Sequence, residues 1–265
     1  MAVSMPALLA DLAAESADLT GMLAPLPPGD WDLPTPAAGW AVRDQVSHLA
    51  FFDEAATLAA TDPDGFTERA SREMTRADFT EEVAREHRGM PPAELLDWLR
   101  RAREGYLRTF AGLDPSARLP WYGPPMSAAS SVTARLMETW AHGQDIADAL
   151  GVTRTPTERL RHVAHLGVRT IGFSFAVHGQ PAPATPIRVE LTAPDGSPWE
   201  WGPADAGDLV RGDALDFCLL VTQRRHRLDT GLRATGPAAE AWLDLAQAFA
   251  GPPGEGRAPI AAGTA

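Results

Sequence analysis

The sequence predicts an α+β protein, with an N-terminal four-helix bundle followed by a small α+β domain. The first 150 residues contain long segments with helical hydrophobic periodicity, joined by irregular connectors. After residue 180 short apolar stretches alternate with turn residues, which is typical of strands. We therefore place the first domain at residues 1–155 and the second at 156–250. The Gly- and Pro-rich segment 251–265 is expected to be a flexible tail.

The predicted helices of the first domain have recognisable boundaries. Helical periodicity covers residues 4–25, 42–60, 67–88, 91–113 and about 130–150. The charged segment 67–88 is either one helix or two short ones. Gly151 suits the left-handed position that follows a helix. Four long helices with extended connections are typical of a four-helix bundle.

The second domain should mix helices and strands. In TRTPTERL, Thr155 and Glu158 fit a capping box with Pro156 at the first helical position. PIRVELTAPDGSPWEWG predicts two strands around a PDGS turn, and HRLDTGLRATG predicts a short strand. DALDFCLLVTQRRH and AAEAWLDLAQAFAG are the remaining predicted helices.

Composition limits the kinds of binding partner that we expect and indicates the cellular compartment. The net charge of −12 argues against nucleic acid or an anionic lipid surface as partner. Cys218 is the single cysteine and cannot form an internal disulfide, which fits a reducing cytoplasm. The N-terminus contains acidic residues and is not expected to be a signal peptide, and no apolar run is long enough for a membrane helix. We expect a cytoplasmic protein, either a monomer or a homodimer.

His48 is the first candidate site residue. Residues three and four apart on a helix share a face, so His48 in RDQVSHLAFFDEAATLAA aligns with Phe51 and Phe52 and points into the core. A buried imidazole needs a hydrogen-bond partner or a metal ion. His48 is therefore either a core histidine bonded to Asp44 or a backbone carbonyl, or a metal ligand.

A second set of candidates lies in METWAHGQDIADAL. Glu138, His142 and Asp145 follow one another at spacings of four and three, and taken alone they have the pattern of a solvated helix face. Ala141 and Ala149 flank this stripe and would let another helix approach, so the helix can be buried on both sides. If the two helices are neighbours, His48, Glu138 and His142 form a set of two imidazoles and one carboxylate. Such a set binds a divalent transition metal with coordination positions left open.

These two segments also carry a family resemblance. GWAVRDQVSHLAFFDEAA resembles the second-helix signature of the DinB-like metal-binding bundles, and most closely the pattern GW-x-VRD-x-x-x-HL of the mycothiol-dependent maleylpyruvate isomerase family. RLMETWAHGQDIADALG resembles that family's fourth-helix pattern, E-x-x-x-H-x-x-D. The resemblance spans residues 5–245, and the layout is also similar to an actinobacterial subgroup of metal-binding proteins. It implies a DinB-like bundle, an α+β C-terminal domain, and His48, Glu138 and His142 as metal ligands.

The resemblance further implies a divalent-metal-dependent enzyme that acts on a small metabolite. The reaction would be thiol-assisted isomerisation or thiol transfer, with mycothiol as the thiol and Glu138 and Asp145 as catalytic residues. Asp145 could orient a ligand imidazole; otherwise it is a surface acid or makes a local contact at the helix end. Zinc is the first choice of metal, with nickel, iron and manganese as alternatives. Three other hypotheses remain: a hydratase, dehydratase or hydrolase without thiol, a non-catalytic metal or small-molecule binding protein, and a solvated stripe that binds no metal.

Other residues have weaker signals. Ala41 stands where the family often has Ser or Thr, so Asp44 is expected to cap this helix instead. Arg224 and Arg225 could hold carboxylates or a cofactor, or could simply complement the dipole of a helix C-terminus. Cys218 lies in the apolar run FCLLV and is expected to be a buried, unreactive thiol. A further group covers the bundle end or lines the mouth of the metal pocket: Trp31, Trp40, Trp121 and Tyr122.

Overall fold

The computed structural model describes residues 4–76, 78–254 and 256–260, which form two compact units, Met1–Arg154 and Thr155–Ala265. The predicted tail lies partly outside the described residues, at 255 and 261–265. Its described part is bonded to the second unit, because the Gln247 amide donates to the carbonyls of Gly251 and Pro252 and the Ile260 N–H donates to Asp229.

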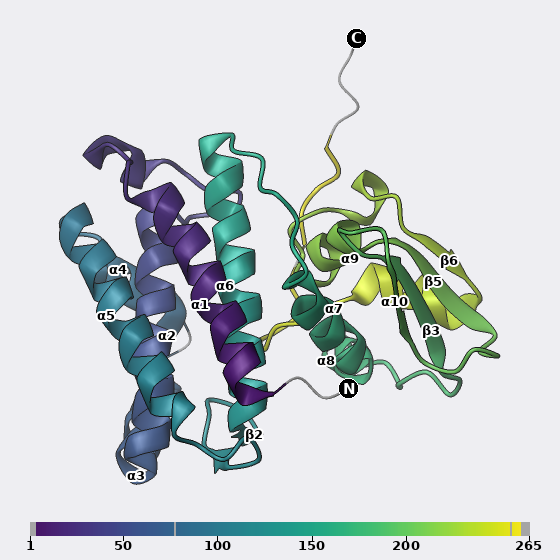
Figure 1. Ribbon diagram of the computed structural model, residues 1–265, viewed down its shortest axis with the longest axis horizontal. Helices are drawn as coiled ribbons and strands as arrows, with labels where there is room; N and C mark the ends of the chain where they lie inside the picture. The colour runs from purple at the N-terminus through teal and green to yellow at the C-terminus, as the bar shows by residue number, and fades with distance from the viewer. Residues whose placement is uncertain (1–3, 77, 255, 261–265) are drawn as a thin grey trace. The chain divides into compact units, whose positions relative to one another are not determined.

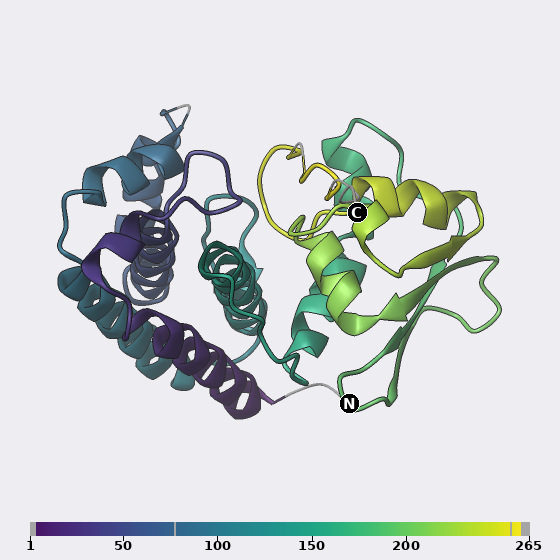
Figure 2. The same ribbon diagram turned by 90° about the horizontal axis from the view of Figure 1, so that it is seen from above.

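The first unit is the predicted four-helix bundle. Within the described part of this unit the long helices are α1 (Met5–Leu23), α2 (Val42–Thr61), α5 (Pro92–Ala111) and α6 (Ala128–Leu150). Helices α1 and α2 each pack against both α5 and α6, which closes a ring around one core (Figure 1; Figure 2). Leu19, Val46, Leu49, Leu95 and Ile146 are buried there. The apolar spacing read from the sequence therefore faces inward, as the fold class requires.

The connectors contain short elements. The charged segment forms two short helices, α3 (Pro63–Glu73) and α4 (Phe79–His87), because the Asp62 carboxylate caps the Gly65 N–H and Pro63 occupies the first turn. The 3-10 helix η1 (Pro28–Asp32) follows α1, and the strands β1 (Arg118–Leu119) and β2 (Met126–Ser127) precede α6. Gly151 ends α6 with φ +64°, as predicted.

Asp44 caps α2, as expected. Its carboxylate accepts a hydrogen bond from the Ala41 backbone N–H at 2.9 Å, which is the half of a capping box that needs no hydroxyl at the N-cap. The same carboxylate is buried and receives two hydrogen bonds from the Arg88 guanidinium, at 2.9 and 3.1 Å. Asp44 thereby ties the start of α2 to the end of α4.

The capping box lacks its second hydrogen bond, because Ala41 has no hydroxyl, and this gives a testable prediction. Ala41→Ser should raise the free energy of unfolding by about 0.5–1 kcal/mol, because a serine hydroxyl on this extended N-cap would accept a hydrogen bond from the Asp44 N–H. Urea denaturation measures the change. Ala38→Ser places the same hydroxyl at an exposed position of the connector and should have no effect. Equal effects of the two substitutions would contradict the expectation.

The second unit is an α+β domain. Its described residues include a four-stranded sheet of order β4-β3-β5-β6. The strands are β3 (Ile187–Thr192), β4 (Pro198–Trp201), β5 (Asp208–Asp213) and β6 (Arg233–Thr235). As predicted, β3 and β4 form an antiparallel hairpin, whereas β3 and β5 are parallel. The other elements are α7 (Leu160–Arg169), α8 (Ile171–Val177), α9 (Ala214–Val221), η2 (Arg227–Asp229) and α10 (Pro237–Leu245).

Two local predictions for this unit are wrong. Helix α7 begins at Leu160, so Thr155 and Glu158 do not form a capping box. The reason is tertiary: Arg154 is bonded to the Trp140 carbonyl and to Glu15, which holds the preceding chain on the first unit. Helix α10 ends at Leu245, six residues before the end of the predicted helical segment at Gly251, and the Gln247 N–H donates to the Ser174 hydroxyl instead.

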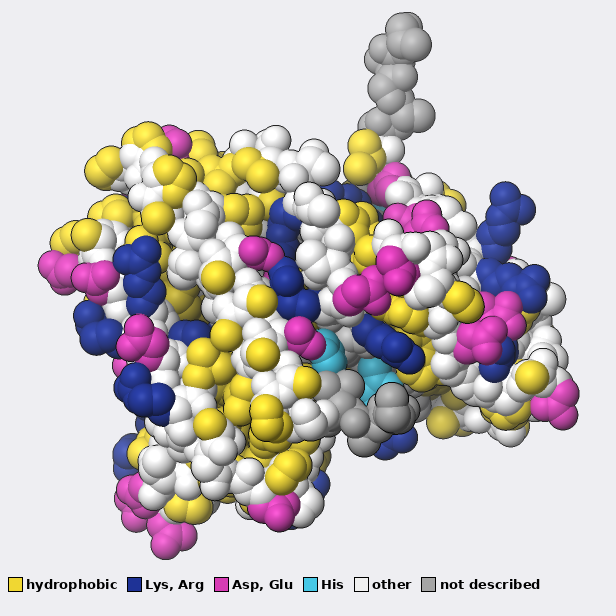
Figure 3. Space-filling model, viewed as in Figure 1, with side chains coloured by type: hydrophobic (Ala, Val, Ile, Leu, Met, Phe, Trp, Pro, Cys, Tyr) yellow, Lys and Arg dark blue, Asp and Glu magenta, His cyan; other side chains and the backbone are white. Residues whose placement is uncertain are grey.

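The described surface mixes charges of both signs. Figure 3 shows acidic and basic side chains interspersed over the face formed by α5, where Arg100 pairs with Asp97 and Arg108 with Glu104. Among the helices that the structure describes, none has both the length and the apolar content needed to cross a membrane.

Candidate metal centre

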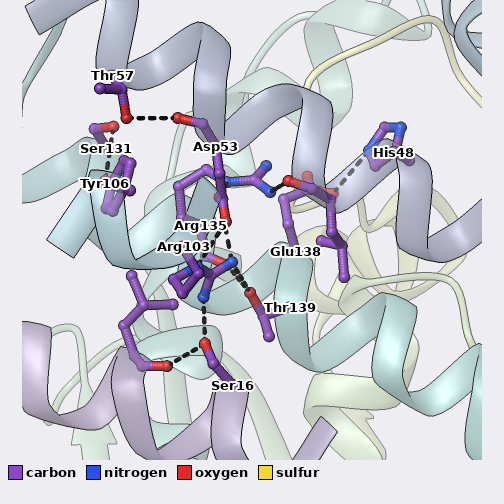
Figure 4. Close-up of polar contacts among 12 residues, drawn as sticks. Ser16, His48, Asp53, Thr57, Arg103, Tyr106, Ser131, Arg135, Glu138 and Thr139 are labelled. Carbon is purple, nitrogen blue, oxygen red and sulfur yellow. Dashed lines mark hydrogen bonds and ion pairs between the residues drawn. The ribbon is translucent and has the colours of Figure 1, made fainter. Parts of the chain in front are cut away.

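Helices α2 and α6 bring the three predicted metal ligands together. The Nε2 atom of His142 lies 3.1 Å from Glu138 Oε2, and Nε2 of His48 lies 3.9 Å from the same oxygen. One ligand atom from each residue can be chosen so that all three lie within 4.8 Å of one another. Figure 4 shows the Glu138 carboxylate on α6 directed toward His48 on α2. All three side chains keep a small exposed fraction, between 11 and 22%.

The stripe on α6 is not a solvated face. His142, Ala141 and Asp145 are all buried, and Asp145 is only 1% exposed. The small side chain of Ala141 is buried beside the stripe, and α6 packs against α1 and α2. The helix is therefore buried on both of its sides, and the alternative of a polar face in water is wrong.

His48 lacks the partner that an ordinary core histidine would have. Its Nδ1 atom is buried without a hydrogen bond to any described residue, and 3.9 Å from Nε2 to Glu138 exceeds a hydrogen bond. The expected alternative partner, Asp44, is engaged by Ala41 and Arg88. No described residue hydrogen-bonds Nε2, the ring nitrogen that lies nearest to Glu138, so this nitrogen is placed to bind a metal ion held by the three residues. Two imidazoles and a carboxylate are donors that suit a divalent transition metal.

The electrostatics favour a neutral His48 imidazole and an ionised Glu138 carboxylate, which are the forms that bind a cation. Burial, together with the neighbouring His142, lowers the pKa of His48 to about 4, so its imidazole is neutral at pH 7. Burial alone would raise the pKa of Glu138, but the close contacts with His142 and His48 outweigh it and hold that pKa well below its usual range. Glu138 is therefore a carboxylate at neutral pH.

A residue that the sequence analysis missed contacts the centre. Gln45 is fully buried on α2, and its Oε1 atom accepts a hydrogen bond from Nδ1 of His142. Both ring nitrogens of His142 thus contact other residues, Gln45 and Glu138. A catalytic role for Asp145 stays a prediction. The available signal was spacing, since Gln45 precedes His48 by three residues and shares its helix face.

Aromatic side chains surround the two imidazoles. The Trp40 ring stacks on His142, with centroids 6.0 Å apart and planes at 20°, and meets His48 edge-on at 5.3 Å. Phe52 lies 4.6 Å from the His48 ring on the other side and contacts Trp121 and Tyr122. Trp40 therefore lies against the two imidazoles of the candidate centre. Trp31 is instead part of the bundle core.

A buried ion network lies one helical turn from the centre. Asp53 on α2 receives hydrogen bonds from Arg103 on α5, at 2.6 and 3.2 Å, and from Arg135 on α6, at 2.9 Å (Figure 4). Arg103 also donates to Ser16 on α1 and to Thr139 on α6. The network connects the four bundle helices and fixes α2 against α6, which is the pairing that places His48 beside Glu138.

Arg224 and Arg225 lie at the end of α9, in the second unit. Their guanidinium groups donate to nearby backbone carbonyls, those of Thr222 and Arg224. Thr222 is the C-cap of α9, so the contact of Arg224 agrees with a basic side chain that satisfies a carbonyl at the helix end. Arg225 also lines a cavity of about 340 Å³ together with His178 and His226. A cofactor-binding role for the two arginines stays a prediction.

Cys218 is fully buried in α9 and is not a nucleophile at a site. Its thiol donates to the Leu160 carbonyl at 3.4 Å, and burial raises its pKa. We expect no alkylation by iodoacetamide in the native protein at mildly alkaline pH, and complete alkylation once guanidinium chloride unfolds the chain. Mass spectrometry measures the modification. Rapid labelling of the folded protein would contradict the burial and the raised pKa.

Comparison with known proteins identifies the family. The family model of the mycothiol maleylpyruvate isomerase N-terminal domain matches residues 12–147, and a model described as wyosine base formation matches residues 183–232. Two proteins from two strains of Mycobacterium tuberculosis, both named as uncharacterized, are each 51% identical over 252 residues, which is 94% of this chain and 97% of theirs.

Solved structures share the fold over most of the chain. The mycothiol-dependent maleylpyruvate isomerase matches with a TM-score of 0.59 at 14% identity, and a histidine-to-alanine mutant of it matches with 0.61 at 13%. Each match covers 88% of this chain and 93% of the other. With the fold and the matched bundle in agreement, the chain belongs to the family of the mycothiol maleylpyruvate isomerase N-terminal domain.

Proposed function

We propose that this protein is a divalent-metal-dependent enzyme that uses mycothiol to isomerise a small unsaturated acid, or transfers the thiol to an electrophilic metabolite. The observation that supports this most is the placement of His48, Glu138 and His142 around one point of a bundle that belongs to the maleylpyruvate isomerase family. The expected metal is zinc, with nickel, iron or manganese as alternatives.

The three side chains have distinct roles in this proposal. His48, neutral at pH 7, and His142 each supply a ring nitrogen, and Glu138 supplies a carboxylate that offsets part of the ion's charge. Three protein ligands leave coordination positions open for a thiol, a water molecule or a substrate oxygen. When bound, the ion would lower the pKa of the thiol or water and polarise the substrate oxygen. Trp40 and Phe52 limit the access of bulk water to the two imidazoles.

The chemistry proposed for isomerisation conserves all atoms of the substrate and the thiol. The mycothiol sulfur adds to one carbon of a conjugated double bond, which becomes a single bond and rotates. Expulsion of the same sulfur restores the double bond with the opposite geometry. If the adduct is instead protonated and released, the reaction is a thiol transfer.

The test is turnover of cis-unsaturated dicarboxylic acids and of epoxides, with and without mycothiol, followed by loss of substrate and by adduct mass. We expect turnover that requires mycothiol and is lost in His48→Ala and in His142→Ala. His87→Ala is the matched control, because His87 stacks on Trp98 elsewhere in the same unit. Turnover without thiol would indicate a hydratase or hydrolase. Metal and thiol binding without turnover would indicate a binding protein.

A further inference from the structure

The connector before α2 is joined to the metal centre by a chain of hydrogen bonds with a fixed direction. The chain begins at the backbone carbonyl oxygen of Trp40, which can only accept. The Thr35 hydroxyl donates to this oxygen at 2.8 Å, so its single proton is committed. The Thr35 oxygen can therefore act only as an acceptor toward its other neighbour.

That neighbour is Gln45. Its Nε2 atom donates to the Thr35 hydroxyl oxygen at 2.9 Å, which fixes the orientation of the side-chain amide. The amide oxygen then faces Nδ1 of His142, and because an amide oxygen cannot donate, Nδ1 must carry a proton. The other ring nitrogen, Nε2, faces Glu138 at 3.1 Å.

We propose that Thr35 and Gln45 are positioning residues that keep Nδ1 of His142 protonated, so that Nε2 is the nitrogen presented to the metal ion. The inference rests on the proposed function in that it assumes a metal ion at this centre. The three groups are buried, so water does not compete for these hydrogen bonds and a reversed amide would leave polar atoms unsatisfied. A hydrogen bond that fixes the tautomer of a ligand histidine is a recognised way to tune a metal site.

The chain also links the centre to the residue that covers it. Trp40 supplies the terminal carbonyl, and its indole ring lies over His142 and against His48. Thr35 is held to Trp40 twice, since its backbone N–H donates to the same carbonyl at 2.8 Å. The connector therefore holds the Trp40 ring over His142 and, through Thr35 and Gln45, also sets which nitrogen of His142 carries the proton.

Substitution at Thr35 tests the proposal. Thr35→Val keeps the shape of the side chain but removes the acceptor for Gln45, so the amide is free to reverse and place its N–H₂ group toward His142. We expect zinc affinity to fall about 10–100-fold, as for loss of a group that supports a metal ligand. Proton–nitrogen NMR of the histidine rings should show a solvent-protected Nδ1–H of His142 in the wild type and its loss in Thr35→Val. Thr35→Ser retains the hydroxyl and should restore both readouts.

A matched control separates loss of the Thr35–Gln45–His142 hydrogen-bond chain from a general loss of packing. Ser131→Ala removes a buried hydroxyl that bonds to Tyr106 in the same bundle, and should leave both zinc affinity and the Nδ1–H signal unchanged. The proposal is overturned if Thr35→Val keeps the signal and the affinity of the wild type. It is also overturned if Thr35→Val and Thr35→Ser lose affinity equally.

The experiment distinguishes failure of the proposed function from failure of the proposed hydrogen-bond chain. The NMR measurement is made on metal-free protein as well as on the zinc-loaded form. A wild type that binds no zinc would overturn the metal-dependent function, while the Nδ1–H signal would still decide the tautomer. Absence of that signal in metal-free wild-type protein would overturn the proposed role of Thr35 and Gln45, whatever the zinc titration shows.

Discussion

Asp53→Ala is expected to lower the free energy of unfolding by about 3–5 kcal/mol. Asp53 is completely buried between Arg103 and Arg135, whose side chains are only 6 and 4% exposed. Removal of the carboxylate leaves two guanidinium charges in the bundle interior without the acid that offsets them. An uncompensated buried charge is among the most costly single changes in a protein core, and a loss of this size is a large share of a typical domain's stability.

Urea denaturation followed by circular dichroism measures this loss. Asp97→Ala is the matched control, because Asp97 is 60% exposed and pairs with Arg100 at 3.7 Å on the surface of α5. Its removal should change the free energy of unfolding by less than about 1 kcal/mol. Asp53→Asn keeps the volume and one acceptor oxygen, so it should lose less than Asp53→Ala. Equal, small losses for Asp53→Ala and Asp97→Ala would show that the buried network does not stabilise the bundle.

Glu138→Gln is expected to weaken zinc binding by more than about 100-fold, since loss of a supporting group alone costs about 10–100-fold. Glutamine has the size of glutamate and keeps one acceptor oxygen beside His142. It lacks the negative charge that offsets part of the charge of a divalent ion, and Glu138 supplies the only carboxylate of the three-residue donor set. The low pKa of Glu138 means that the wild-type carboxylate is ionised throughout the neutral pH range.

Competition with a chromophoric chelator gives the zinc dissociation constants. Glu54→Gln is the control, because Glu54 lies on α2, as His48 does, is exposed, and accepts a hydrogen bond from Trp98. It should bind zinc as the wild type does. Circular dichroism of each protein confirms the helical fold. Unchanged zinc affinity in Glu138→Gln would remove Glu138 from the set of ligands.

The bundle and the buried faces of the two helices that carry the candidate ligands could be predicted because both depend on residues close together in the sequence; the pairing of the two helices came from the family resemblance. The alignment of His48 with Phe51 and Phe52 on one helix face implied an inward imidazole. Ala141, beside Glu138 and His142, indicated that a second side of α6 is covered. Helical spacing alone determines these relations, so they required no knowledge of distant contacts.

Features that depend on distant contacts were missed. Strand β5 has the charged sequence DLVRGD, and its Asp208 is buried because the N–H groups of Ala238 and Ala239, some thirty residues later, bond to its carboxylate. Gln45 has no local signal for its partner Thr35, which lies in an irregular connector. The capping box of Thr155 had the correct residue types, but the contacts of Arg154 with the first unit prevailed over local preference.

The proposed function requires that His48, Glu138 and His142 hold a divalent metal ion. The most direct test is elemental analysis by mass spectrometry of protein purified without a histidine tag and without added metal. We expect about one zinc, nickel, iron or manganese ion per chain in the wild type, and none in His48→Ala or in His142→Ala. Wild-type protein that contains no such ion, and takes up none from added zinc, would contradict it.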